Sequence, residues 1–495
     1  MRSSFHGIEV SKRGLFAQQA ALNTTSHNIA NANTEGYSRQ RVNLVTTNGL
    51  PYVGLHAGTE AGLLGTGVRA DNIQRLRNEF LDIQYRNEFN RQGFWDARAE
   101  TLERLEGIMN EPSETGLQKV MDQMWQSWQD LANDPSDTSA RAVVRERSQA
   151  VADTFNSLYT QLNQVQADLN NVISVKTLEI NSLGQQIAAL NGQIANLVPH
   201  GYTPNDLYDQ RDVLLDRLSN LVSINVTPTT SGMVDVTIQG QAFVTGQASQ
   251  VMATQQNPAT GLYSMTLGGA PFVPTSGYMA GTFEARDQIV TNMKSRLDVL
   301  AVNLTKEIND IHRAGRSLAD IQNNAVQDLP FFVDRTAVAG DPATKNYPTG
   351  AASIVINPAI LQSLDAIAAA KAGNPTTSVG NNEAALDIAA IKFKVLAAGA
   401  GPLDLPENTT LDSYYQNTIS QLGVSAQEAI RNQANAEMLV DTVGNQRQSV
   451  SGVSIDEEMA ELVKFQHAYS ASARVMTSMD EILDRVINGM GRVGL

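Results

Sequence analysis

The stretch NDLYDQRD, residues 205 to 212, places three aspartates and one arginine within about one and a half turns of an expected helix. Carboxylates beside a guanidinium could act as a general acid and base, but Arg beside Asp more often forms a structural ion pair or caps a neighbouring helix. A second such pair occurs in FEARDQ, residues 283 to 288, at the start of another expected helix. We therefore predict structural ion pairs, not catalytic ones, at Asp209, Arg211, Asp212, Arg286 and Asp287. The sequence does not show whether the two clusters meet.

The other residue types that carry chemistry are scattered or missing. The six histidines form no HExxH motif and no cluster at metal-ligand spacing, and the chain has no cysteine, which excludes thiolate nucleophiles and disulfides. The glycines of GLLGTGVRA, residues 62 to 70, have the wrong order for a dinucleotide-binding loop. No phosphate-binding GxxxxGK[ST] loop and no GxSxG motif is present. The sequence thus predicts no catalytic residue, no metal and no cofactor.

The length of the chain and its net charge limit the number of domains and the classes of partner that we expect. A chain of 495 residues is expected to form two to four domains. Its formal net charge of −15 repels phosphate backbones and anionic lipid, so we expect no nucleic-acid partner. No window of 18 apolar residues predicts membrane insertion, and the start, MRSSFHGIEVSKRGLF, lacks the apolar run of a secretory signal. If the protein leaves the cell, we expect export without a cleaved signal peptide.

Both ends of the chain show helical periodicity with a narrow apolar stripe. At the amino-terminal end a seven-residue repeat with small or polar residues around it predicts a seam of Ile8, Leu15, Leu22 and Ile29. At the carboxy-terminal end, steps of three and four residues predict a seam that includes Met459, Leu462, Tyr469, Ala473, Met476, Leu483 and Ile487. Such narrow stripes need a partner. Either they dock on the body of the protein, or they pair with each other and with neighbouring copies.

The interior of the chain is mostly helical. Helices are expected over residues 73–109, 117–131, 138–197, 281–313 and 410–447, and the third of these would be a rod of 60 residues, on the order of 90 Å long. Alternating Val and Ile residues with Gly turns predict a small sheet within 223–280. Residues 314–405 lack regular periodicity and suggest a smaller exposed domain or insertion, whose fold the sequence leaves open. The expected fold class is mainly α with a smaller β part: paired, coiled-coil-like terminal helices, an elongated helical body and a small β-rich or irregular outer domain.

The stretch LNTTSHNIANANTEGYSRQ, residues 22 to 40, is rich in amide side chains. Asn31, Asn33 and Gly36 are expected to end the first helix, because amide side chains and glycine tolerate turn conformations that β-branched residues resist. The alternating SRQRVNLV that follows predicts an extended segment. We interpret the stretch as a structural corner and not as an active site.

The first 42 residues also carry a family resemblance. GLFAQQAALNTTSHNIANANTEGYSRQRV, residues 14 to 42, resembles the amino-terminal signature of bacterial flagellar rod, hook and hook-associated proteins. The family pattern falls on Asn28, Ile29, Ala30, Asn31, Thr34, Gly36 and Tyr37. This motif is specific to the axial proteins of the flagellum, but it does not separate hook subunits from junction subunits.

Five further segments resemble the hook-associated branch of this family, which forms the junction between hook and filament. They are YSRQ (37–40), NDLYDQRD (205–212), GTFEARDQ (281–288), INPAI (356–360) and SGVSIDEE (451–458), and they follow the family's order over nearly the whole chain. The resemblance implies three regions: 1–72 with 452–495 as the terminal axial region of the inner tube with an extended linker; 73–222, 281–313 and 406–451 as a long-helix body; and 223–280 with 314–405 further out.

The resemblance also implies a function. The protein would be a structural subunit, not an enzyme, that assembles helically through its terminal helices and provides the platform for growth of the flagellin filament. Its implied partners are its own copies, hook protein, a second junction protein, flagellin-side subunits and an export chaperone, in the extracellular flagellum. Two alternatives remain open: a hook or distal rod subunit, which shares the first motif, and an enzyme within 314–405, which would require a defined cleft or a bound metal.

Overall fold

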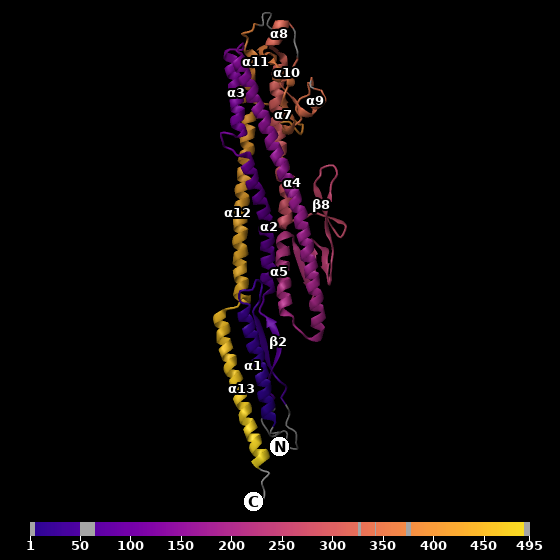
Figure 1. Cartoon of the computed structure of the whole chain (residues 1–495), viewed down its shortest axis with the longest axis vertical. Helices are drawn as coiled ribbons and strands as arrows, with labels where there is room; N and C mark the ends of the chain where they lie inside the picture. The colour runs from indigo at the N-terminus through magenta and orange to yellow at the C-terminus, as the bar shows by residue number, and fades with distance from the viewer. Residues whose placement is uncertain (1–4, 50–64, 325–327, 342, 373–377, 490–495) are drawn as a thin grey trace.

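The computed structural model describes residues 5–49, 65–324, 328–341, 343–372 and 378–489. The molecule is elongated, with both ends of the chain at one tip, a bundle of long helices in the middle and a cluster of short elements at the other tip (Figure 1). Small sheets lie on one flank of the bundle. The expected fold class, mainly α with a smaller β part and paired terminal helices, is therefore confirmed.

The terminal helices form an antiparallel pair. α1 (His6–Ala30) runs toward the body, and α13 (Ile455–Gly489) runs back from it beside α1. A hairpin of β1 (Gln40–Thr46) and β2 (Val68–Arg75) packs against α1, with Gln40 opposite Arg75 and Thr46 opposite Val68. We refer to α1, α13 and this hairpin as the terminal unit.

Six long helices build the body. They are α2 (Glu79–Met109), α3 (Leu117–Asn133), α4 (Thr138–Leu197), α5 (Asn205–Leu221), α7 (Thr291–Ala314) and α12 (Leu411–Ser451). The rod of 60 residues expected over 138–197 is confirmed as α4, which begins where the Asp137 carboxylate accepts hydrogen bonds from the backbone N–H groups of Ser139 and Ala140. The fully buried Trp128 and Phe155 belong to the core of this bundle.

The expected sheet within 223–280 is confirmed as two small antiparallel sheets that pack on α4. One has the order β3 (Ile224–Pro228), β4 (Val234–Ile238), β5 (Gln241–Thr245), β6 (Ala248–Ser249), and the other is β7 (Met252–Gln256), β8 (Tyr263–Leu267), β9 (Ala270–Phe272). A Cβ built on Gly184 of α4 would lie 2.5 Å from the Phe243 ring, so glycine permits this close packing. Asn181 and Asn191 of α4 each exchange hydrogen bonds with a strand residue's backbone.

The sheets lead back to the bundle through α6 (Gly277–Glu284), which continues through a π-helical turn, Ala285–Val290, into α7. α6 packs against α2. Gly281 faces the backbone carbonyl of Phe94 so closely that any side chain at this position would collide with it.

Residues 314–405 form the tip opposite the terminal helices. They contain the strand pairs β10 (Gly315–Ser317) with β13 (Ala368–Lys371) and β11 (Phe332–Asp334) with β12 (Ile354–Ile356). Short helices connect them: α8 (Leu318–Asn323), α9 (Arg335–Gly340), α10 (Pro358–Gln362) and α11 (Glu383–Ala390). Phe331 and Ile354 share one hydrophobic core with Trp128 and Leu102 of the bundle. The described part of this region therefore extends the bundle core, and of the two expectations, a smaller exposed domain or an insertion, the shared core favours the insertion.

Candidate functional site

The two terminal helices meet along a seam of small residues. A Cβ built on Gly7 would lie 3.0 Å from Met479 Cε, and one on Gly14 would lie 3.2 Å from Ser472 Oγ, while Asn28 hydrogen-bonds Glu458. The three contact positions on α1, and likewise the three on α13, are separated by multiples of seven residues. Ala21, which is almost fully buried, occupies the α1 position halfway between Gly14 and Asn28. The seven-residue period expected from the sequence is thus present, but its phase on α1 is one residue earlier.

The residues predicted for the seam lie beside it. Ile8, Leu15, Leu22 and Ile29 are half-buried, as are Leu462, Ala473 and Met476, and Leu483 is buried. Met459, Tyr469 and Ile487 are exposed by 53%, 38% and 65% in the single chain. The physical reason is distance: glycine and alanine let the two backbones approach closely, and the large side chains are displaced to the flanks.

Asn28 connects the terminal helices to the corner that follows α1. Its side chain is 1% exposed and makes four hydrogen bonds. Nδ2 donates to the Gln40 carbonyl and to Glu458 Oε2, both at 2.9 Å, and Oδ1 accepts from the Gln40 N–H at 3.0 Å and from Tyr37 Oη at 2.8 Å. All donors and acceptors of this amide are therefore used where water cannot reach them.

The rest of the family motif shapes the same corner. α1 ends at Ala30, and Asn31 Nδ2 donates to the His27 carbonyl at 3.0 Å, as expected of a residue that ends the helix. Thr34 Oγ1 donates to Asn31 Oδ1. Gly36 has a φ of +77° and lies directly against Val213 of α5, so a side chain would be both strained and blocked. Burial, together with the charges of Asp206, Asp209 and Glu458, raises the pKa of Tyr37, which keeps its hydroxyl a donor.

Arg39 extends this corner to the start of α13. Its Nε and Nη1 donate to Glu458 Oε1 at 2.6 Å and to Glu457 Oε2 at 2.7 Å. Its backbone N–H donates to the carbonyl of Ser451, the last residue of α12, and its own carbonyl accepts from the N–H of Leu76. One residue therefore links the corner, the end of α12, the start of α13 and the segment before α2.

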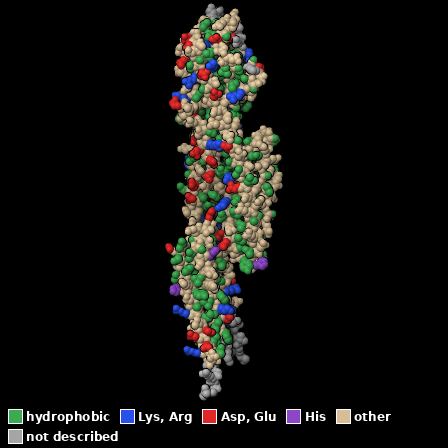
Figure 2. Space-filling view, in the orientation of Figure 1, with side chains coloured by type: hydrophobic (Ala, Val, Ile, Leu, Met, Phe, Trp, Pro, Cys, Tyr) green, Lys and Arg blue, Asp and Glu red, His purple; other side chains and the backbone are tan. Residues whose placement is uncertain are grey.

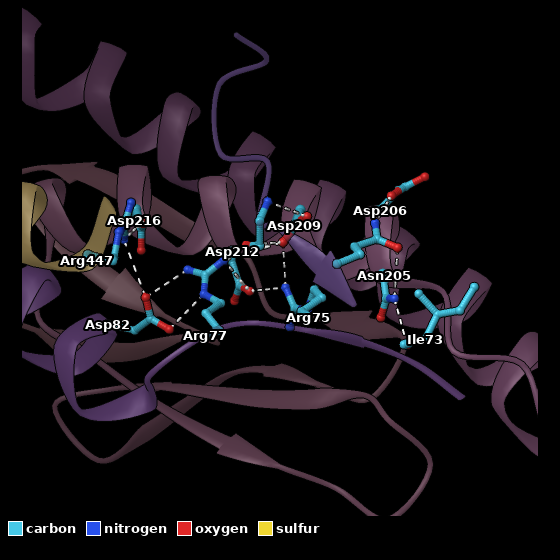
Figure 3. A network of polar contacts seen from close by, with 12 residues as sticks. Ile73, Arg75, Arg77, Asp82, Asn205, Asp206, Asp209, Asp212, Asp216 and Arg447 are labelled. Carbon is cyan, nitrogen blue, oxygen red and sulfur yellow. Dashed lines mark hydrogen bonds and ion pairs between the residues drawn. The ribbon is translucent and has the colours of Figure 1, made fainter. Parts of the chain in front are cut away.

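Four arginines and four aspartates join the terminal unit to the body, and all of them except Arg86 are labelled in Figure 3. Arg75 donates to Asp209 and Asp212 at 2.8 Å, and Arg77 makes a two-pronged pair with Asp82. Arg86 contacts Asp212 and Asp216, and Arg447 of α12 contacts Asp216 at 2.6 Å. We call these eight residues the arginine–aspartate network: Arg75, Arg77, Arg86, Arg447, Asp82, Asp209, Asp212 and Asp216. Equal numbers of opposite charges allow the network to be mostly buried.

Asp212 lies at the centre of the network. Its burial favours the neutral acid, but the charges of Arg77, Arg75 and Arg86 outweigh this effect and lower its pKa to about 2. Asp209 also accepts from the N–H and Oγ of Ser38 at 2.9 and 2.7 Å, so the network reaches the corner as well. Asp212 is therefore held as an ionised acceptor and has no proton to give at neutral pH.

The predicted ion pairs are only partly as expected. Arg286 does pair with Asp287, through Nε and Nη2 at 2.7 and 3.0 Å, beside the sheets and apart from the arginine–aspartate network. Arg211 instead donates to neutral acceptors, Asn191 Oδ1 at 3.1 Å and the Gly232 carbonyl at 2.9 Å. Successive residues of a helix are rotated by about 100°, so side chains two positions apart point about 160° away from each other. Arg211 therefore faces α4 and the sheet, while Asp209 faces the terminal unit.

Most of the network has no signal in the sequence, with one exception. Asp209, Asp212 and Asp216 of α5 follow steps of three and four and so lie on one helical face. Their partners Arg75, Arg77 and Arg86 come from a strand end and another helix, and no local pattern connects these to α5.

The corner at Asn28 and Arg39 and the arginine–aspartate network together form what we call the joint between the terminal unit and the body. This joint offers little for catalysis or metal binding. Three open grooves of about 570, 600 and 670 Å³ surround it, and the carboxylates of the network that line them are bound by arginines. Among the described residues no group of three His, Asp or Glu side chains could hold a metal ion. Within the same described ranges, none of the helices combines the length and the apolar character that crossing a membrane requires.

Comparison with known proteins places the chain among flagellar proteins. Residues 102–332 match the family described as flagellar hook-associated protein FlgK helical domain. Residues 8–37 match that of flagella basal body rod protein, and 445–489 that of the flagellar basal body rod FlgEFG protein C-terminal. The flagellar hook-associated protein 1 of Bacillus subtilis (strain 168) is 37% identical over 99% of both chains, and that of Escherichia coli (strain K12) is 26% identical over 96% of this chain and 98% of its own.

A solved structure shares the fold. The flagellar hook junction protein FlgK from Burkholderia pseudomallei superimposes with a TM-score of 0.59 at 16% identity, covering 76% of this chain and all of that one.

Proposed function

The chain belongs to the family of flagellar hook-associated protein 1, and from that premise we infer that its buried joint sets the angle between the terminal helices and the body in every copy. Its role is structural: it is a subunit of the bacterial flagellum at the junction between hook and filament. The observation that carries the inference is the buried hydrogen bond between Asn28 and Glu458, which ties the two ends of the chain to one corner.

An assembly of identical subunits needs such a fixed corner. In a helical array each copy contacts its neighbours through different faces, and an angular error in one copy would be repeated along the array. The network of four arginines and four aspartates supports this role, because its members come from β2, the short segment after it, α2, α5 and α12. Their ion pairs can all form in only one arrangement of these elements.

The surface for neighbouring copies is formed by the large apolar side chains that α13 leaves exposed in the single chain. They include Met459, Val463, Val475, Ile482 and Val486 and are distributed around the helix. Figure 2 shows hydrophobic side chains gathered on the terminal unit and charged ones along the middle of the molecule. An apolar surface of this extent on a helix is normally covered in the working state. Neighbouring terminal helices would cover it in the assembly.

The remaining partners follow from the same premise. The copies would join hook protein on one side and a second junction protein and flagellin-side subunits on the other. An export chaperone would cover the exposed apolar side chains of α13 before assembly, and the chain would leave the cell without a cleaved signal peptide. No catalytic activity is proposed, since the carboxylates of the joint are held by arginines and the relatives are flagellar structural proteins.

Electron microscopy of a deletion strain tests this function. Loss of the gene is expected to leave hooks of normal length without filaments, and flagellin should accumulate in the medium. A plasmid copy should restore filaments, and gold-labelled antibody should mark a short zone at the distal end of the hook. Filaments of normal length in the deletion strain would refute the junction role, and basal bodies without hooks would indicate a hook or rod subunit instead.

A further inference from the structure

Two grooves lie on opposite sides of α5 at the level of the joint. One, of about 600 Å³, is lined by Asp206, Asp209 and Val213, and the other, of about 670 Å³, by Tyr208, Arg211 and Leu215. At 100° per residue these two sets point in opposite directions from the helix axis. Two copies placed side by side would therefore present different grooves to each other.

The first groove, which we call the acidic groove, has only carboxylates as charged lining residues: Glu35, Asp206 and Asp209. The Glu35 side chain is 77% exposed, and its pairing with the half-exposed Arg217 spans 3.3 Å. Such an exposed pair contributes little and is easily exchanged. The Asp206 side chain is 57% exposed; its Oδ1 accepts a hydrogen bond from Gln40 Nε2 at 2.8 Å, and His27 lies 3.3 Å away. The rim of this groove thus offers two carboxylates to a partner.

The second groove, which we call the guanidinium groove, has an excess of positive charge. Four arginines line it against three carboxylates, Glu79, Asp82 and Asp212, so the excess is one charge. Arg75, Arg77 and Arg86 are bound to the aspartates of the network. Arg211 is different: it is 5% exposed, its hydrogen bonds go to neutral acceptors, and its Nε has no hydrogen-bond partner among the described residues. A buried guanidinium without a carboxylate contact favours the approach of an anion.

The surroundings of Arg211 restrict what kind of anion fits. The Tyr208 ring lies between Arg75 and Arg211, with guanidinium carbons 5.0 and 5.1 Å from its centre. Ile83 lines the groove and is 58% exposed, and the neighbouring Phe80 is 70% exposed. This apolar rim around a cationic floor matches a carboxylate on a protein surface better than a strongly hydrated free ion.

We propose that neighbouring copies of this chain meet laterally, with the Glu35 and Asp206 edge of one copy docked in the guanidinium groove of the next. The proposal rests on the proposed function, because it needs copies side by side in one assembly. Since the two grooves point in opposite directions from α5, the contact is heterologous and can repeat around a ring, whereas a two-fold contact would stop at a dimer. The opposite charges of the two grooves would fix both partner and register.

Cross-linking of introduced cysteines tests this contact, because the chain has no cysteine of its own. Asn33 lies two residues from Glu35 and Asn87 lines the guanidinium groove, and both are exposed. In flagella isolated from cells that make Asn33→Cys/Asn87→Cys, a short bifunctional maleimide should produce dimers, trimers and larger species of the chain. Each single variant should stay monomeric, as should Asn33→Cys with Gln129→Cys on the exposed side of α3.

The charge of Glu35 is tested in the same background. Adding Glu35→Lys should abolish the ladder of cross-linked dimers, trimers and larger species. Adding Glu35→Asp or the exposed Asp71→Lys should leave this ladder intact. A ladder that survives Glu35→Lys would overturn the role of the carboxylate, and a dimer from Asn33→Cys alone would show a two-fold contact and overturn the docking. Absence of any ladder in flagella that contain the double variant at normal level would refute the docking and leave the junction role standing. Absence of the unmodified chain from flagella would refute both.

Discussion

Asn28 and Glu458 are 430 positions apart in the sequence and share a buried hydrogen bond of 2.9 Å. The same amide holds Gln40 and Tyr37, and the same carboxylate holds Arg39. One contact therefore fixes the end of α1, the corner after it and the start of α13 together. The molecule's two ends meet the body at a single defined point because these few polar groups satisfy one another.

Asn28→Ala should loosen this corner. The substitution leaves Tyr37 Oη, the Gln40 backbone groups and one oxygen of Glu458 without a partner, which would cost about 2 kcal/mol or more. We expect faster amide hydrogen exchange over residues 31–40 and less of the chain in isolated flagella, while exchange in α3 and α4 stays unchanged. Asn23→Ala, at an exposed position of the same helix, is the control. Equal behaviour of the two variants would contradict the role given to Asn28.

Gly14→Leu should separate the terminal helices. A Cβ at this position already lies 3.2 Å from Ser472 Oγ, and a larger side chain would force the backbones apart at a cost of about 1–3 kcal/mol. Gly14→Ala should be tolerated better, because the Ser472 side chain can turn away. Distances between spin labels on α1 and α13 in assembled flagella would report the separation. Gln19→Leu, at an exposed position of α1, should leave them unchanged.

Local signals predicted the elements well, since their causes are local. The apolar stripe of α4 recurs along most of the helix, with buried polar residues such as Asn170 and Asn191 within it, and the alternating strands around Val236 are ended by glycine turns. The phase of the α1 seam was misjudged by one residue because the largest apolar side chains were assumed to face the partner helix. Gly7 and Gly14 face it instead, and a glycine gives no hydrophobic signal in the sequence.

The joint could be predicted only in part. The corner at Asn31 and Gly36 follows from turn chemistry, and the aspartate spacing on α5 indicates one charged face. The arginines that meet this face come from β2, α2 and α12, up to 231 positions away, and their convergence depends on how whole helices pack. Arg211 lines the same groove as these arginines but donates to Asn191 and to the Gly232 carbonyl instead of an aspartate, and sequence proximity to Asp212 does not reveal this.

Asp212→Asn should destabilise the joint strongly. Removal of this charge leaves Arg75, Arg77 and Arg86 close together with one carboxylate fewer, and breaking a buried pair in this way typically costs about 3 kcal/mol. A lower urea midpoint of unfolding, with an unchanged slope, would measure it. Asp71→Asn, which removes an exposed pair with Arg69, should have almost no effect. A similar loss in both variants would mean that the network contributes nothing specific.

His312 should make the tip opposite the terminal helices sensitive to acid. Burial lowers the pKa of this histidine from its ordinary 6.5 to about 4, against smaller effects of the Leu329 carbonyl and the Asp320 charge. Its neutral ring connects the Leu329 carbonyl at 2.7 Å to the N–H of Ala368 at 2.9 Å. Between pH 6.5 and 4 the unfolded chain binds the proton and the folded chain does not. Stability contributed by the neutral ring is therefore complete above pH 6.5 and falls by about 3 kcal/mol on acidification to pH 4.

His312→Gln isolates that effect. The variant should have a lower free energy of unfolding at pH 7. Its loss of unfolding free energy between pH 6.5 and 4 should be smaller than that of the unchanged protein, because the contribution of His312 is absent. Urea unfolding followed by the fluorescence of Trp128, which stacks edge-on against Phe331 beside His312, would measure both proteins at each pH. Parallel pH profiles for the two proteins would rule His312 out as the source.

Ile482→Asp should block assembly without unfolding the subunit. Ile482 is 55% exposed on the side of α13 that is open in the single chain, whereas the neighbouring Leu483 is 6% exposed and belongs to the pair within one chain. A carboxylate at 482 would stay hydrated in the free subunit and would have to be buried among apolar side chains in the assembly, which costs at least several kcal/mol. We therefore expect an unchanged circular dichroism spectrum and unfolding midpoint, and at least a tenfold loss of the chain from isolated flagella, since about 1.4 kcal/mol is tenfold. Leu483→Asp should instead disturb the α1–α13 pair of the free subunit itself. Normal filaments from Ile482→Asp cells would show that this face of α13 stays open to water in the flagellum.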